Sequence, residues 1–70
     1  MEIENSMTPA AVAELLIDEY ERNISATAVH SDEFQKLAIS RELKKRGYKI
    51  VWFYFDSDID HYHVEIDSRA

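Results

Sequence analysis

The first patterned segment of the chain has its apolar residues at the spacing of an α-helix. At 100° per residue they form one stripe about 140° wide, made of Val12, Ala13, Leu16, Ile17, Tyr20 and Ile24. Thr8 and Pro9 suit a helix start, because threonine caps the first turn and proline has its φ preset. The pattern predicts a helix from about residue 9 to residue 23. Its opposite face is acidic and carries Glu14, Asp18 and Glu21.

A second helix is predicted between Ser31 and Gly47. Ser31 is a suitable N-cap, and the two acidic residues after it favour the positive end of the helix dipole. Gly47, the only glycine of the chain, stands where a left-handed residue ends many helices. The apolar residues of this helix cover a wide arc, as expected between another helix and a sheet; they are Phe34, Leu37, Ile39 and Leu43. Residues 24–30 are predicted to be a connection that could extend either helix.

The last third of the chain has the pattern of a β-hairpin. Residues 48–55 are almost all aromatic or β-branched, residues 56–60 have turn composition, and residues 61–67 alternate between apolar and polar. With Phe55 opposite His61, one face is wholly apolar, and a one-residue slip would mix apolar with charged positions. This register predicts that one set of side chains packs on Leu16, Tyr20, Leu37 and Leu43; the set is Ile50, Trp52, Tyr54, Tyr62, Val64 and Ile66.

The same register leaves apolar side chains on the face away from the helices. Val51, Phe53 and Phe55 would share that face with His61 and His63. A two-stranded sheet is marginal in water, and an uncharged β-prone run is prone to aggregate as an open edge. The predicted fold class is therefore α+β in the order ααββ, as one domain over residues 1–70. The sheet would be completed by a short N-terminal strand at residues 2–4, by dimerisation, or by a foreign partner.

Composition narrows the classes of function. Seventy residues without cysteine form one small domain that no disulfide can stabilise. The net charge of −6 disfavours nucleic acid as a partner and permits a basic protein surface. Residues 1–7 do not resemble a signal peptide, and the longest apolar run, residues 50–55, is too short to span a bilayer. The expected location is the cytoplasm of a bacterium or of a phage-infected cell.

Two histidines are the main candidates for chemistry. His61 and His63 lie two residues apart on one strand, so both could bind one Zn²⁺ with a third ligand from elsewhere. The alternative is a solvated strand face. The acidic loop at residues 56–60 matches a calcium-binding loop only in part, because His61 stands where the turn glycine belongs. No catalytic triad or phosphate-binding loop is present in the sequence, so neither an enzyme nor a cofactor is predicted.

One short segment resembles a known family. A helix followed by Gly47, Tyr48, a strand and then a histidine is similar to small ribonuclease toxins of the HicA type. The Gly-Ser pair that precedes the histidine in those toxins is absent, and the acidity of the chain is unlike that of an RNA-binding protein. Membership of the family is therefore not predicted.

The sequence as a whole predicts a small acidic protein–protein interaction module of the accessory or inhibitor kind. Its partner, or a second copy, would contact the face carrying Val51, Phe53, Phe55 and the two histidines, or the acidic face of the first helix. The alternative is a metal-binding protein or small nuclease built on His61 and His63.

Overall fold

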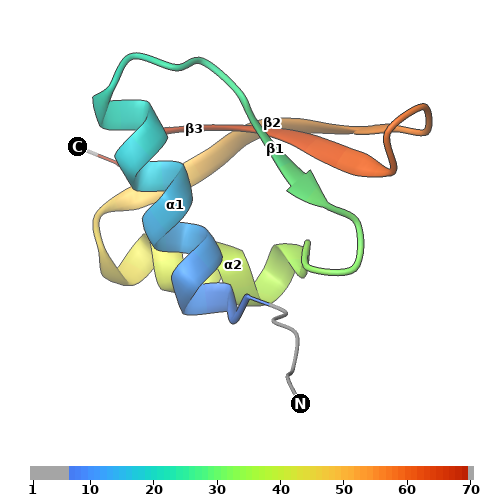
Figure 1. Cartoon of the computed structure of the whole chain (residues 1–70). Coiled ribbons are helices and arrows are strands. Elements are labelled where there is room, and N and C mark those ends of the chain that lie inside the picture. Colours follow the sequence, from blue (N-terminus) through green and yellow to red (C-terminus); the bar gives the residue numbers. More distant parts are fainter. Residues whose placement is uncertain (1–6, 70) are drawn as a thin grey trace.

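The computed structural model describes residues 7–69, which form two helices and one three-stranded sheet. The elements in chain order are α1 (Pro9–Glu21), β1 (Thr27–His30), α2 (Lys36–Lys45), β2 (Tyr48–Asp56) and β3 (His61–Ser68). The sheet is antiparallel in the order β1-β3-β2. Both helices lie on one side of it, and the β2–β3 hairpin extends beyond them (Figure 1). The α+β class is confirmed. Neither described helix is long and apolar enough to cross a membrane.

β1 is a strand where the sequence predicts only a connection. Thr27–His30 pairs antiparallel with β3, so the sheet has three strands rather than the two of the predicted hairpin. Thr27 and Val29 are buried against the helices, while Ala28 between them is exposed. Four residues give too short an alternation to be recognised, and the pairing partner lies more than thirty residues away. The other predicted source of a third strand, residues 2–4, lies outside the described residues.

The start of α1 is as predicted, and its end comes two residues early. The Thr8 hydroxyl oxygen accepts a hydrogen bond of 3.1 Å from the backbone N–H of Ala11, and Pro9 is the first helical residue. Asn23 has a positive φ of 66°. The two backbone hydrogen bonds of a Schellman motif surround it and close the helix. Asparagine tolerates the left-handed region better than most residues, so Asn23 terminates the helix rather than being its last helical residue.

α2 begins later than the sequence predicts. The hydroxyl of Ser31, the expected N-cap, donates instead to Asp60 Oδ1 at 2.8 Å. Residues 31–33 form a separate turn, and α2 starts at Lys36 without a side-chain cap. Glu33, expected in the first helical turn, accepts a hydrogen bond of 3.0 Å from the backbone N–H of Met7. Ser31 and Glu33 resemble helix-capping residues in the local sequence, but their side chains hydrogen-bond to residues distant in the sequence.

Gly47 ends α2 as predicted. Its φ is +87°, in the region that glycine adopts without strain. Its backbone N–H donates to the carbonyl oxygen of Lys44 at 3.1 Å, which satisfies one of the free carbonyls at the helix end. The turn at Gly47 directs the chain straight into β2.

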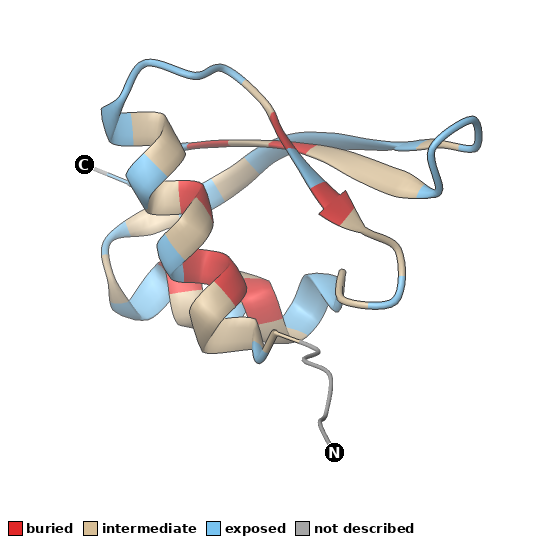
Figure 2. Ribbon diagram, in the orientation of Figure 1, coloured by how far each residue is buried: buried red, intermediate tan, exposed pale blue. Residues whose placement is uncertain are grey.

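The core lies between the two helices and the middle of the sheet (Figure 2). Its buried apolar residues are Val12, Ala13, Leu16, Val29, Ile39, Leu43, Val64 and Ile66. Leu37, which the sequence assigns to the core, is 72% exposed. The wide apolar arc of α2 therefore overstates its buried face, which contains only Ile39 and Leu43.

A β-bulge at Val51 changes the predicted register of the hairpin. Ile50 faces Ile66 as predicted, but beyond the bulge Trp52 pairs with Glu65 rather than with Val64. An extra residue on one strand moves every later side chain to the other face of the sheet. The predicted faces of β2 are therefore correct at Ile50 and inverted beyond Val51, whereas those of β3 are as predicted along the whole strand.

The inversion overturns the prediction that Trp52 is a core residue. Trp52 and Tyr54 lie on the face away from the helices and are 45% and 47% exposed. Phe53 and Phe55 lie on the helix side, opposite Val64 and Tyr62 of β3. Every position of β2 from residue 50 to residue 55 is apolar, so the strand itself has no alternation that could reveal the bulge.

Candidate functional site, an exposed aromatic hairpin arm

The far half of the β2–β3 hairpin, residues 51–63, is a projection rich in exposed apolar side chains, which we call the hairpin arm (Figures 1 and 2). Six of its side chains are 38–48% exposed; they are Val51, Trp52, Phe53, Tyr54, Phe55 and Ile59. At roughly 200 Å² for an aromatic side chain, they expose on the order of 500 Å². Summed over both faces of the arm, that area is comparable to the largest single apolar patch on a typical monomer, where such patches often have a function.

An aromatic cluster supports the arm from the helix side. The ring of Phe34 stacks on Tyr62 with 4.5 Å between centroids and lies 5.4 Å from Phe53. Phe55 lies 5.1 Å from Tyr62, and the Nζ of Lys36 is 5.5 Å from the centre of the Phe53 ring. Such ring pairs add to the stability given by burial alone. The cluster therefore holds the start of the arm in place while leaving its rings partly open to solvent.

A second row of rings lies on the outer face of the sheet, away from both helices. Trp52 and Tyr54 have centroids 5.1 Å apart, and Tyr54 stacks on His63 at 4.9 Å. His63 Nε2 is 3.0 Å from Asp56 Oδ2. Each ring of this row therefore contacts its neighbour.

The outer edge of β2 pairs with no other strand among residues 7–69. Between Lys49 and Asp56 the strand carries neither a charge nor a proline. Natural proteins usually protect an open edge with charges, proline or a bulge, and here only the bulge at Val51 is present. The arm therefore presents unpaired backbone groups together with apolar side chains on both faces.

The contact between His63 and Asp56 has an electrostatic consequence. The hydrogen bond with His63 holds the pKa of the Asp56 carboxyl below its ordinary value, and the backbone N–H of Asp58 acts in the same direction. A carboxyl whose pKa is lowered by folding stabilises the fold at pH above its ordinary pKa. That contribution is lost as the pH falls through the lowered value.

We expect the substitution His63→Leu to raise the carboxyl pKa of Asp56 toward its ordinary value, because the main hydrogen bond is removed. The measurement is an NMR titration of the side-chain carboxyl carbons. Asp67 is the internal control, since the hydroxyl of Tyr20 is the main cause of its lowered pKa and is untouched. An Asp56 pKa that does not move would contradict the pairing.

The two histidines predicted as metal ligands do lie on one face, and a third joins them. His61 Nδ1 is 2.5 Å from the carbonyl oxygen of Ile59, and His63 contacts Asp56. The ring of His30 in β1, which the sequence did not single out because its strand was missed, is 5.2 Å from that of His61. Across residues 7–69, no three histidine, cysteine or acidic side chains are grouped so that they could hold a metal ion.

The structure separates residues that the sequence places in one patch. Phe53 and Phe55 face the helix side, whereas His61 and His63 are on the outer face, and Val51 is at the bulge. The aromatic residues that share the outer face with the histidines are Trp52 and Tyr54, which the sequence pattern predicts to be in the core. Only the uninterrupted apolar run could have signalled that both faces of the strand are exposed.

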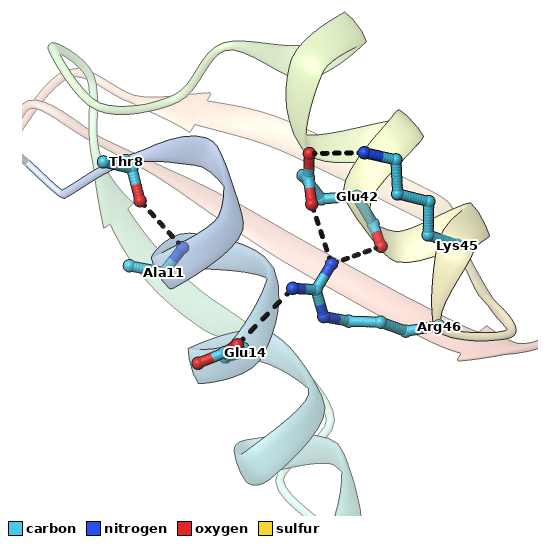
Figure 3. A network of polar contacts seen from close by, with 6 residues as sticks. All are labelled: Thr8, Ala11, Glu14, Glu42, Lys45 and Arg46. Carbon is cyan, nitrogen blue, oxygen red and sulfur yellow. Dashed lines mark hydrogen bonds and ion pairs between the residues drawn. The ribbon is translucent and has the colours of Figure 1, made fainter.

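The acidic face of α1 is engaged within the protein. Glu14 Oε2 is 3.4 Å from Arg46 Nη2, which joins α1 to the end of α2 (Figure 3). Glu21 accepts a hydrogen bond of 3.2 Å from the hydroxyl of Tyr48, and Asp18 forms a salt bridge within α1. These carboxylates already have partners, so the hairpin arm is the stronger candidate for contact with another molecule.

Comparison with known proteins adds no relative to this picture. No protein-family model matches the chain, and neither a curated protein nor a solved structure shows significant similarity to it. The evidence for the candidate site is therefore the geometry of the chain itself.

Proposed function

We propose that this protein is a small non-enzymatic module that binds another protein chain through its hairpin arm. The observation that carries the proposal is the run of five apolar residues from Val51 to Phe55 on an open edge strand, each 38–48% exposed. Interface cores are enriched in aromatic side chains and poor in charges, as this run is. An isolated domain gains no stability from leaving such an apolar run exposed to water.

The arm is suited to binding by strand addition. In this mode an extended segment pairs with a free sheet edge, and alternate side chains provide specificity. The edge of β2 supplies the backbone groups, while Trp52 and Tyr54 on one face and Phe53 and Phe55 on the other supply the contacts. Ring stacking limits the freedom of these side chains before binding, which reduces the entropy lost on association.

The proposal includes an accessory or inhibitory role in the cytoplasm of a bacterium or a phage-infected cell. Its support is the small size, the net charge of −6 and the absence of cysteine. The alternative, a metal-binding protein or small nuclease, depends on His61 and His63. In the structure His61 Nδ1 contacts the backbone carbonyl of Ile59, and His63 Nε2 contacts the carboxylate of Asp56, so the two rings have different partners and we give preference to the interaction module.

The proposal is tested by placing a photoreactive phenylalanine analogue at Tyr54 and irradiating the cells that produce the protein. We expect a crosslinked adduct of discrete mass, because the outer face of the arm would contact the partner directly. The matched control is the analogue at Ile24, an exposed apolar residue (41%) outside the arm. Arm adducts no more abundant than those at Ile24 would overturn the proposal.

A second measurement uses Trp52→Ser, which should weaken the adduct while the circular dichroism spectrum stays native, since Trp52 is on the face away from the core. Phe53 and Phe55 are not replaced in this test, because both contact the aromatic cluster on the helix side. An adduct that persists in a folded arm variant would contradict the assigned surface.

A further inference from the structure

We propose that the chain bound by the arm is a second copy of this protein, with the two β2 strands paired antiparallel across a two-fold axis. This proposal rests on the function proposed above, since it names the partner for the same surface. Three features of β2 support it: the faces of its residues, the charges at its ends and the area that it exposes.

The bulge makes the edge of β2 self-complementary. Omitting the extra residue at Val51, the strand runs through consecutive ladder positions from Lys49 and Ile50 to Trp52 and on to Asp56. An antiparallel copy centred on Phe53 then brings together residues that occupy the same face of the sheet. The resulting pairs are Ile50 with Phe55, Trp52 with Tyr54, Phe53 with itself, and Lys49 with Asp56.

Each of these pairs is favourable. Ile50 and Phe55 lie on the helix side, while Trp52 and Tyr54 lie on the outer face, so both faces of the joined sheet stay apolar across the axis. Aromatic cross-strand pairs are among the stabilising ones. In a strand without the bulge, the register that pairs Lys49 with Asp56 would bring helix-side residues opposite outer-face residues, so the charge match and the match of faces could not occur together.

The charges at the two ends of the run select an antiparallel copy. Lys49 and Asp56 both lie on the outer face, because their partners on β3, Asp67 and His61, are six residues apart. Antiparallel pairing places the lysine of one copy opposite the aspartate of the other at both ends of the contact. Parallel pairing would place lysine opposite lysine and aspartate opposite aspartate. An unrelated partner strand would need an acidic residue opposite Lys49 and a basic residue opposite Asp56.

The exposed area suits a reversible dimer. The arm exposes on the order of 500 Å² of apolar side chain, so two arms have on the order of 1,000 Å² between them, of which pairing along one edge buries a part; the contact therefore belongs with small, weak interfaces. The unpaired backbone edge adds hydrogen bonds to this contact. Because helix-side residues of one copy lie beside helix-side residues of the other, the helices of both copies are on the same side of a continuous six-stranded sheet.

Sedimentation equilibrium of the full chain over a wide concentration range tests the stoichiometry. We expect a monomer–dimer equilibrium, and we expect Tyr54→Lys to raise its Kd at least about tenfold, because lysine on an edge strand opposes pairing. The matched control Ile24→Lys should leave the Kd unchanged. A chain that stays monomeric at every concentration, or a dimer weakened only by Ile24→Lys, would overturn the proposal.

Disulfide trapping tests the register, since the natural chain has no cysteine. In the proposed pairing, residue 52 of one copy lies directly opposite residue 54 of the other, about 5 Å apart between Cα atoms, which a disulfide can bridge. Trp52→Cys and Tyr54→Cys mixed in equal amounts should therefore form a covalent heterodimer under mild oxidation. Each variant alone should not, because its own cysteines lie diagonally at about 7–8 Å.

Crosslinking of either variant alone as fast as the mixture would contradict this register. The outcomes also separate this proposal from the function on which it rests. A strictly monomeric protein whose arm forms photocrosslinked adducts with a different protein would refute the homodimer and leave the binding module standing. A protein with neither adducts nor dimers would refute both.

Discussion

Replacing Leu43 by alanine is expected to lower the free energy of unfolding by about 3–5 kcal/mol. Leu43 is fully buried in α2 and belongs to the cluster formed with Leu16, Ile39 and Val64. Truncation removes apolar contact and leaves a cavity that close packing does not refill. For a domain of this size the loss is comparable to the entire stability.

The measurement is urea denaturation followed by circular dichroism at low temperature. Leu37→Ala is the matched control on the same helix, because Leu37 is 72% exposed, and it should change stability by no more than about 0.5 kcal/mol. Should Leu43→Ala not fold, Ile39→Val is the milder test, with an expected loss of about 1 kcal/mol. Equal losses at Leu37 and Leu43 would show that the core is misplaced.

The second large effect is expected at Gly47, where the substitution Gly47→Val should cost about 2 kcal/mol. Its φ of +87° is a conformation that residues with a side chain rarely adopt. A Cβ added at this position would meet no heavy atom within 4 Å apart from those of residue 47 and its two chain neighbours. The cost therefore comes from the backbone and not from a steric clash with neighbouring side chains, and β-branching makes it larger.

Comparison of three variants isolates that cause. Asparagine enters the left-handed region more readily than valine or alanine, so Gly47→Asn should be the least destabilised, Gly47→Ala intermediate and Gly47→Val the most. Thermal unfolding under identical conditions provides the ranking. An asparagine variant as unstable as the valine variant would mean that something other than φ controls this site.

The helix ends show which features of the fold can be predicted from neighbouring residues. Thr8, Pro9 and Gly47 act within a few residues of their own position, and the structure places each in its predicted role. Ser31 and Glu33 carried an equally good local signal, but they hydrogen-bond to Asp60 and Met7. A cap can be inferred from sequence only when no distant partner competes for the same side chain.

The candidate site was predictable only in outline. The apolar run of β2 correctly indicated an exposed apolar surface on the hairpin. The division of that run between two faces was wrong beyond Val51, because a bulge adds one residue without leaving a mark in a strand that is apolar at every position. His30 was missed for a related reason, since β1 is defined mainly by its pairing with β3.

Local patterns in the chain were therefore enough to predict the α+β class, the two helices with their apolar stripes, the hairpin and the start of its register at Ile50 and Ile66. These features follow from periodicity and from contacts between near neighbours. The tertiary structure alone decided that residues 27–30 form a third strand, that α2 begins at Lys36, and which rings of the arm face outward. Each of those depends on a hydrogen-bonded or packed partner far along the chain, and the free energy of such a contact is not encoded in any short segment.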